Sequence, residues 1–223
     1  MTVGKGVADV EETRPYIPLI GDPAPDFEAP STHGPIRLSD FRGKWVVLFS
    51  HPADFTPVCT TEFVAFTERA QEFEKRNVKL IGLSVDSVSS HLAWQASIEQ
   101  AFGVTIPFPI VADLSQKVAR TYGMIPPASE STVTVRTVFF IDDKGIVRAL
   151  IYYPLSLGRS MDEILRVVDA LQFNQQEGLS TPANWKPGQP AVVPAPATVE
   201  GLRERMRDAG DPGQRTWYLK LRG

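Results

Sequence analysis

The residue best suited to covalent chemistry is Cys59, the only cysteine among 223 residues. It lies in the stretch VVLFSHPADFTPVCTTEF, between an apolar run and a segment whose apolar residues recur at helical spacing. A thiolate is a strong nucleophile, although an unperturbed cysteine is mostly protonated near neutral pH. A helix N-terminus favours the anion, so a helix that starts near Cys59 would make the thiol reactive. A lone cysteine is more often a small buried apolar residue, and its neighbours decide between these interpretations.

Three features around Cys59 favour the reactive interpretation. A polar, proline-bearing loop separates Cys59 from the preceding apolar run, and the predicted helix begins at Cys59 itself. Thr56 precedes it by one helical turn and offers a hydroxyl that can donate and accept hydrogen bonds. A helix end stabilises an anion by about 0.3–2 kcal/mol, less than the roughly 3 kcal/mol needed to make the thiolate dominant. We therefore expect a cation from elsewhere in the fold to lie beside Cys59.

Alternating strands and helices surround this stretch. Short apolar runs rich in β-forming residues predict strands, and apolar residues at helical spacing predict helices. Ser87 is a candidate N-cap, and Gly123 follows the end of a short helix. Strands are expected at 45–50, 78–85 and 108–113, helices at 59–76, 87–102, 115–123 and 160–172, and a β-hairpin at 134–153.

The order of these elements predicts an α/β fold, with a central mixed β-sheet flanked by helices in the thioredoxin-like arrangement. In such sheets ligands bind at the carboxyl ends of the strands, where Cys59 would lie. We interpret residues 1–16 as a flexible N-terminal lead-in and 17–175 as the folded domain. Residues 176–223 are rich in proline and are interpreted as a C-terminal arm, with a short helix expected near 198–210.

Composition and charge argue against several classes of protein. The formal net charge is −3, which gives no strong field toward nucleic acid or an anionic membrane. No run approaches about 18 consecutive apolar residues, so no membrane partner is expected, and the cytoplasm is the expected location. His33, His51 and His91 lack metal-type spacing along the chain, and no phosphate-binding or dinucleotide motif is visible. We therefore expect neither a metal nor a cofactor.

The segment PADFTPVCTTE has Pro52, Thr56 and Cys59 in the pattern Pro-x-x-x-Thr-x-x-Cys. It resembles the active-site signature of peroxiredoxins, which are thiol peroxidases on a thioredoxin-like fold. The resemblance covers about residues 16–205 and is to the one-cysteine subfamily, which includes archaeal members with a C-terminal arm. Further segments that carry it are LSVDSVSSHLAW, IPFPIVAD, TVRTVFFID and YYPLSLGRSMDEILRVV.

The resemblance implies a role for each matched residue. Cys59 would attack peroxide and become a sulfenic acid, Thr56 would hydrogen-bond the peroxide and the thiolate, and Pro52 would shield the site. Arg136 would be the expected cation, binding substrate and stabilising both the thiolate and the leaving oxygen. Three further matches are supporting residues: His51 at the pocket rim, Glu62 as a carboxylate that orients the arginines, and Arg159 as a second arginine.

Ordinary structural roles stay open for these residues. Arg136 heads an apolar strand, where a charge is costly unless it is paired. Arg159 could be a solvated residue before a helix, and His51 a capping or packing residue. Glu62 could be a carboxylate that favours a helix N-terminus, and Thr56 an ordinary loop residue.

The resemblance implies a thiol-dependent peroxidase that reduces hydrogen peroxide and small organic hydroperoxides. No second cysteine can resolve the sulfenic acid, so an external thiol or another reductant is needed. A homodimer formed by edge-strand pairing, or a decamer built from such dimers, is also implied, with the arm reaching across a partner. The alternative function is a non-enzymatic redox sensor or a chaperone-like interaction protein on the same fold.

Overall fold

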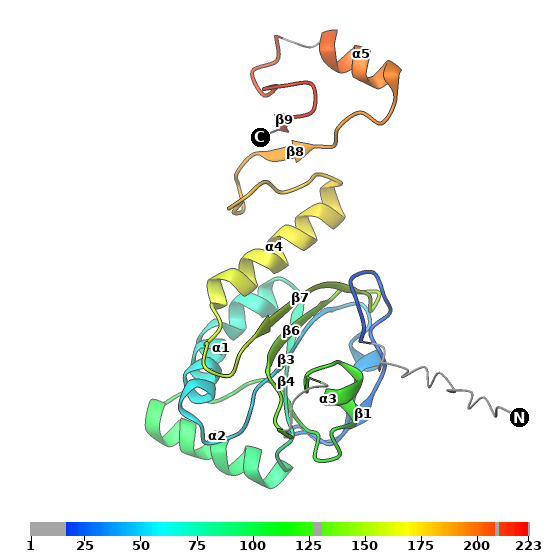
Figure 1. Cartoon of the computed structure of the whole chain (residues 1–223). Helices are drawn as coiled ribbons and strands as arrows, with labels where there is room; N and C mark the ends of the chain where they lie inside the picture. The colour runs from blue at the N-terminus through cyan, green and yellow to red at the C-terminus, as the bar shows by residue number, and fades with distance from the viewer. Residues whose placement is uncertain (1–16, 127–130, 208–209, 223) are drawn as a thin grey trace, which may run out of the picture.

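The computed structural model describes residues 17–126, 131–207 and 210–222, so the predicted lead-in lies outside the described residues. Its centre is a five-stranded sheet in the order β5-β4-β3-β6-β7 (Figure 1). Strands β3, β4 and β5 run parallel, whereas β6 is antiparallel to both β3 and β7. The expected mixed sheet is thereby confirmed. The strands are β3 Trp45–Ser50, β4 Val78–Ser84, β5 Ile110–Ala112, β6 Arg136–Ile141 and β7 Val147–Tyr153.

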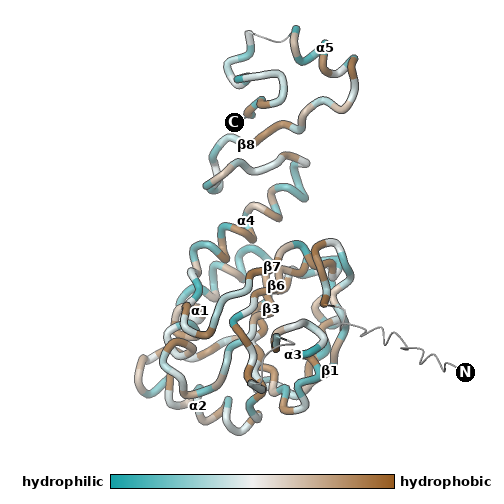
Figure 2. The backbone as a smooth tube through the Cα atoms, viewed as in Figure 1, coloured by the Kyte–Doolittle hydropathy of each residue, from teal (hydrophilic) through white to brown (hydrophobic). Residues whose placement is uncertain are grey.

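Helices and short segments cover both faces of the sheet. Alternate residues of β3 point to opposite faces, so Val47 and Phe49 join one apolar core and Val46 and Leu48 join the other. Figure 2 shows hydrophobic residues concentrated along β3 and β6 at the centre of the molecule. The first core is covered by α1 Pro57–Lys75, α2 Val88–Phe102 and α4 Met161–Glu177, and the second by α3 Lys117–Thr121.

Element boundaries differ from the sequence prediction where proline or glycine decides them. Helix α1 begins at Pro57 rather than at 59, because proline lacks an N–H and suits the first helical position. Strand β5 is shorter than expected, and prolines at 107 and 109 come just before its first residue. Helix α4 runs past 172 to a left-handed Gly178. The predicted cap of α2 is confirmed, since the Ser87 side chain accepts a bond from the backbone of Ser90.

Short N-terminal pieces close the second face of the sheet. Strand β1 Glu28–Ala29 pairs with β2 Ile36–Arg37, and a 3-10 helix, η1, follows at Leu38–Phe41. Elements this short lack a readable period, and the sequence indicated only a turn-rich segment there.

The C-terminal arm follows α4 and lies beyond the end of that helix, away from the sheet (Figure 1). It contains β8 Ala191–Val193, paired antiparallel with β9 Lys220–Arg222, and α5 Val199–Arg207. Trp185 is buried and packs against Phe173 of α4, with ring centroids 4.9 Å apart. Among the described residues, no helix combines the length and apolarity needed to cross a membrane.

Candidate active site

Cys59 is the third residue of α1, at the end of the loop that leaves β3. Thr56 is the N-cap, with extended backbone, and Pro57 opens the helix. Backbone N–H groups in a first helical turn have no intrahelical acceptor and favour an anion. The Cys59 side chain has no exposed surface, so a charge on its sulfur depends on protein groups rather than bulk water.

Arg136 supplies the cation beside the sulfur. It is the first residue of β6, which pairs with β3, so the register of the sheet carries it to the loop after β3. Its Nη1 lies 3.3 Å from Cys59 Sγ, and its Nε donates to the carbonyl of Leu155 at 3.0 Å. The structure thus brings together two residues that lie far apart in the sequence, as expected.

Glu62 lies one helical turn after Cys59 and links the two arginines. Its Oε2 accepts bonds of 2.7 Å from Arg136 Nη1 and from Arg159 Nη2, and its Oε1 accepts two bonds of 2.8 Å from Arg159. Burial raises the pKa of this carboxyl, but the hydrogen bonds and charges of Arg159, then the charge of Arg136, outweigh burial and lower the pKa. Glu62 therefore stays ionised between two cations.

Arg159 is held from every side. Its Nη1 donates to the carbonyls of Ser50 at 2.9 Å and Thr137 at 2.8 Å. The guanidinium carbon also lies 5.3 Å from the centre of the Phe49 ring. With its side chain fully buried, Arg159 contacts Glu62 rather than Cys59. The interpretation of Arg159 as a solvated residue before a helix is wrong.

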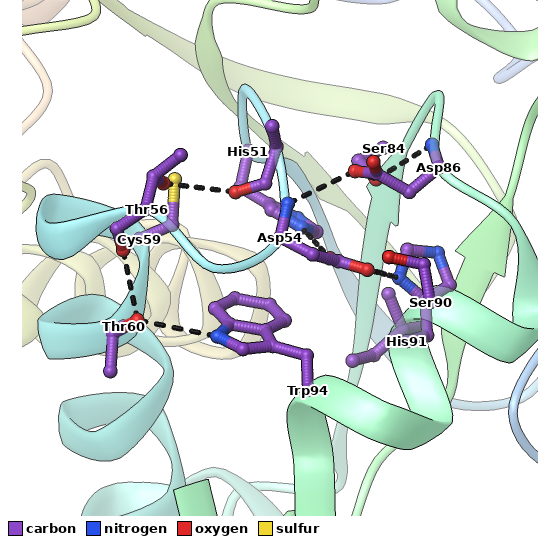
Figure 3. A network of polar contacts seen from close by, with 12 residues as sticks. His51, Asp54, Thr56, Cys59, Thr60, Ser84, Asp86, Ser90, His91 and Trp94 are labelled. Carbon is purple, nitrogen blue, oxygen red and sulfur yellow. Dashed lines mark hydrogen bonds and ion pairs between the residues drawn. The ribbon is translucent and has the colours of Figure 1, made fainter. Parts of the chain in front are cut away.

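Thr56 lies three residues before Cys59, but its hydroxyl bonds elsewhere. Its hydroxyl donates to the carbonyl of Ala53 at 2.9 Å and closes a turn within the loop (Figure 3). The expected hydrogen bond from Thr56 to Cys59 is therefore replaced by one within the loop. The donated hydrogen is used, so the oxygen retains only its capacity to accept. Pro52 is buried at the start of the same loop.

His51 is buried, which corrects the expectation that it lies at a pocket rim. Its ring stacks on Trp94 at 5.2 Å and meets the edge of Phe63 at 4.7 Å, because the loop turns the ring into the space between α1 and α2. Burial is the main reason that the pKa of His51 lies below its ordinary value.

Two residues that sequence reasoning missed, Asp54 and His91, join His51 in a buried cluster (Figure 3). The Asp54 carboxylate lies 3.0 Å from His51 Nε2 and 2.8 Å from His91 Nδ1. Ligand atoms of all three lie within 4.8 Å of one another, so the fold creates a metal-like grouping that sequence spacing does not reveal. Asp54 belongs to the stretch around Cys59, but nothing in the sequence pairs it with His91.

Polar side chains also fasten β6 to β3 near the site. The hydroxyls of Ser50 and Thr137 are 2.8 Å apart, and Thr134 donates to the carbonyl of His51 at 2.6 Å. These contacts fix the strand end that carries Arg136. Sequence reasoning missed them because nothing in the sequence indicates which hydroxyl groups will meet between neighbouring strands.

A buried thiol in the first turn of a helix, facing an arginine on a mixed sheet of this order, defines a thiol-based redox protein of the thioredoxin-like class. The sequence matches the AhpC/TSA family over residues 20–150 and the C-terminal domain of 1-Cys peroxiredoxin over residues 170–209.

Similar proteins agree along most of their length. Peroxiredoxin 2 of Caldanaerobacter subterraneus is 56% identical over 206 residues, covering 92% of this chain and 93% of the relative. The Thermoplasma volcanium peroxiredoxin is 55% identical and covers 91% and 98% of the two chains. A solved yeast mitochondrial 1-Cys peroxiredoxin is 42% identical with a TM-score of 0.79, covering 91% and 98%. The chain therefore belongs to the peroxiredoxin family and is a thiol-dependent peroxidase, whose single cysteine fits a one-cysteine mechanism.

Proposed function

We propose that Cys59 is the thiolate that cleaves peroxide and that Arg136 activates it. The proposed substrates are hydrogen peroxide and small organic hydroperoxides. The observation that carries this assignment is the 3.3 Å contact between Arg136 Nη1 and Cys59 Sγ, in a site without exposed surface at the sulfur. A cation at this distance in a poorly solvated site stabilises an anion more than it would in water.

In the proposed step the thiolate attacks one peroxide oxygen. The S–O bond forms while the O–O bond breaks, and the leaving oxygen takes the electron pair and then a proton to become water or an alcohol. The sulfur is oxidised to a sulfenic acid as the peroxide is reduced. Arg136 faces both the thiolate and the charge that develops on the leaving oxygen, so it stabilises the transition state as well.

The other site residues shape this step. We assign Thr56 to accepting a hydrogen bond from the peroxide hydroxyl, because its own hydrogen is directed to Ala53. Pro52 adds an apolar, buried surface at the start of the loop, which limits water near the thiolate. Glu62 and Arg159 are proposed to orient Arg136 without touching substrate, as their mutual hydrogen bonds indicate.

An external thiol is proposed to complete the cycle. Its sulfur would attack the sulfenic acid, forming a mixed disulfide and releasing water, and a second thiol would then release the Cys59 thiol as a new disulfide forms. The yeast mitochondrial relative is described as resolved through glutathione and thioredoxin systems, which makes glutathione the first reductant to test.

The proposed function is tested by mixing reduced protein with one equivalent of hydrogen peroxide. Thiol loss should be far faster than for free cysteine, the mass should rise by one oxygen, and added glutathione should give an adduct. Cys59→Ser should abolish all three results. Rapid peroxide consumption by that variant would show that the assignment to Cys59 is wrong.

Assembly and location are also proposals. We propose that two chains form a homodimer through β7 and that such dimers assemble into a decamer. We also propose a cytoplasmic location, where the thiol is kept reduced. Strand β7 is at the edge of the five-stranded sheet, and the side chain of Tyr152 on it is partly exposed. Sedimentation of the reduced protein tests the assembly: a single monomeric species at micromolar concentration would contradict it.

A further inference from the structure

Both ring nitrogens of His91 face oxygen atoms. Nδ1 lies 2.8 Å from Asp54 Oδ2, and Nε2 lies 3.2 Å from the carbonyl oxygen of Val111. A carbonyl and an ionised carboxylate can only accept hydrogen bonds. A neutral imidazole has one N–H, so it would leave one nitrogen lone pair facing an oxygen lone pair inside the protein. A positive charge must therefore lie between His91 and Asp54, carried either by a proton or by a metal ion.

Distances favour the proton. A tetrahedral ion with ligands at about 2.0–2.1 Å separates its ligand atoms by roughly 3.3 Å. The observed separations from Asp54 are 2.8 Å to His91 and 3.0 Å to His51, which match direct charge-assisted hydrogen bonds. An imidazolium on His91 satisfies both of its contacts at once.

Charge balance agrees with this assignment. Burial would raise the pKa of Asp54, but hydrogen bonds from His51 and His91 outweigh burial and lower it, so the carboxylate is ionised. Burial keeps His51 neutral, and His51 donates Nε2–H to Asp54, while its buried Nδ1 has no hydrogen-bond partner in the part of the chain that the structure describes. One anion and one cation then neutralise each other, and Asp86, the next carboxylate, lies on the backbone side of Asp54.

The cluster is connected to the loop that carries the thiol (Figure 3). Asp54 donates its backbone N–H to Asp86 at 3.0 Å, so both its side chain and its backbone are fixed. Phe55 follows in a left-handed conformation with φ of 56°, which is strained for a side chain of this size. Such strain persists only where the surroundings over-determine the backbone. Thr56, the N-cap of the helix that bears Cys59, comes next.

We propose that His91 is a positioning residue, whose imidazolium holds the Asp54 carboxylate and thereby fixes the strained loop that places Thr56 and Cys59 for reaction with peroxide. The effect on reactivity rests on the proposed role of Cys59, whereas the protonation of His91 does not. The side chain of His91 contacts Asp54 and the carbonyl oxygen of Val111, so we assign its effect on the thiol to Asp54.

Protonation is tested by nitrogen-15 NMR of the wild-type protein. The chain has only three histidines, and His51→Gln and His33→Gln variants assign their signals. His91 should show hydrogens on both ring nitrogens at neutral pH, and His51 should show an unprotonated Nδ1. An unprotonated His91 nitrogen, or a stoichiometric metal found in the purified protein by elemental analysis, would overturn the proposal.

Reactivity is tested with His91→Gln, which leaves the Asp54 carboxylate without its cation. Because a misplacement of about 1 Å can cost on the order of 100-fold in rate, oxidation of Cys59 should slow by roughly that factor. The double variant Asp54→Asn/His91→Gln removes both charges and should recover about tenfold, since coupled residues are not additive. His33→Gln, on an exposed histidine, is the matched control and should keep the wild-type rate.

Equal rates for the single and double variants would contradict a charge pair. The NMR result remains decisive if either variant fails to fold. If Cys59→Ser still consumed peroxide, the proposed function would fail while the protonation of His91 stood unaffected, so the two failures are distinguishable.

Discussion

Arg136 contacts Cys59 and is linked through Glu62 to Arg159, and the three charges leave one net positive charge to balance a thiolate. Glu62 alone would oppose ionisation of the thiol because it is an anion one helical turn away. Arg159 donates most of the hydrogen bonds that the Glu62 carboxylate accepts. Arg136 can therefore share its Nη1 between Glu62 and the sulfur. At the scale of single residues, the reactive thiol therefore depends on a network and not on the helix end alone.

Arg136→Met should reduce the thiolate fraction of Cys59 at neutral pH and slow its oxidation. Loss of one charged hydrogen bond, at about 1.5–3 kcal/mol, corresponds to roughly 10- to 160-fold in rate. Ultraviolet absorbance of the thiolate and stopped-flow oxidation by hydrogen peroxide measure the two effects. Arg120→Met, at an exposed position on α3, is the matched control. Unchanged thiolate absorbance in the Arg136 variant would count against the role of Arg136.

Glu62→Gln should make stability less dependent on acid pH. Burial raises the pKa of Glu62, but Arg159 and Arg136 lower it further, so the folded pKa lies below the ordinary 4.5. The stabilising contribution is then fully present above about pH 4.5 and disappears as pH falls through the folded pKa. At pH 7 the variant should lose about 3–5 kcal/mol, since breaking a buried ion pair leaves charges without a partner.

Urea unfolding of both proteins at pH 7 and pH 3 measures this difference. Wild type should lose more free energy of unfolding between the two pH values than Glu62→Gln does. Glu204→Gln, exposed on α5, should behave like the wild type. A variant with an acid dependence equal to that of wild type would show that Glu62 is not coupled to the arginines in solution.

Residues of the site differ in how far the sequence could predict them. Cys59 and Thr56 are adjacent to a strand and a helix start, so spacing and helix physics indicate them directly. Arg136 could be placed only by family resemblance, because sheet pairing brings it to the site. Asp54 and His91 gave no signal, since their pairing depends on how α2 packs beside the loop after β3.

At the scale of elements, the spacing of apolar residues along the sequence predicted the main strands and helices. It could do so because the strands are apolar on both faces and each main helix buries one apolar face against the sheet. Boundaries were less predictable, since a proline can begin a helix as well as interrupt a chain. The helix predicted over 160–172 starts at Ser160, and in the structure the hydroxyl of Ser160 caps α4 by accepting a hydrogen bond from the backbone of Glu163. That cap directly follows Arg159, whose backbone N–H bonds Glu62 at 2.8 Å. The beginning of α4 is therefore part of what holds the arginine network.

Ser160→Ala should cost about 1 kcal/mol of stability, as loss of an N-cap does. Peroxide oxidation of Cys59 should also slow, by up to about fivefold if the whole effect reaches the site. Thr198→Ala provides the matched control, because Thr198 accepts from the backbone of Gly201 at the start of α5 in the arm. That control should leave the oxidation rate unchanged. Equal oxidation rates for wild type and Ser160→Ala would show that the cap of α4 does not influence the reactivity of Cys59.

At the scale of the whole molecule, the fold buries the Cys59 sulfur, although the proposed cycle requires it to react with a peroxide and then with an external thiol. Cys59 is fully buried, so reactivity toward peroxide reflects activation by the site and not exposure. A bulky maleimide should consequently label the folded protein more slowly than it labels free cysteine, whereas hydrogen peroxide should react faster than with free cysteine. Unfolding in urea should remove both differences. Rapid maleimide labelling of the folded protein would show that the thiol is open in solution.

The arm is attached to the enzyme through α4. Trp185 has 2% of its surface exposed, packs on Phe173 and donates its Nε1–H to the carbonyl of Gln189 at 2.9 Å. Trp185→Ala should therefore loosen the arm locally by about 3–5 kcal/mol, as loss of a buried tryptophan does. Among the described residues, the buried core cluster that contains Cys59 does not include Trp185, so the rate of Cys59 oxidation should not change.

Limited proteolysis followed by mass spectrometry should find new cleavage after 177 in the Trp185 variant. Trp217→Ala, at a tryptophan that is 46% exposed, is the control and should retain the wild-type digestion pattern. Stopped-flow oxidation and sedimentation of the same samples separate the possible roles of the arm. A lower sedimentation coefficient with an intact oxidation rate would assign the arm to assembly. A slower oxidation would instead mean that the arm supports the thiol site through α4 and Arg159, contrary to our expectation.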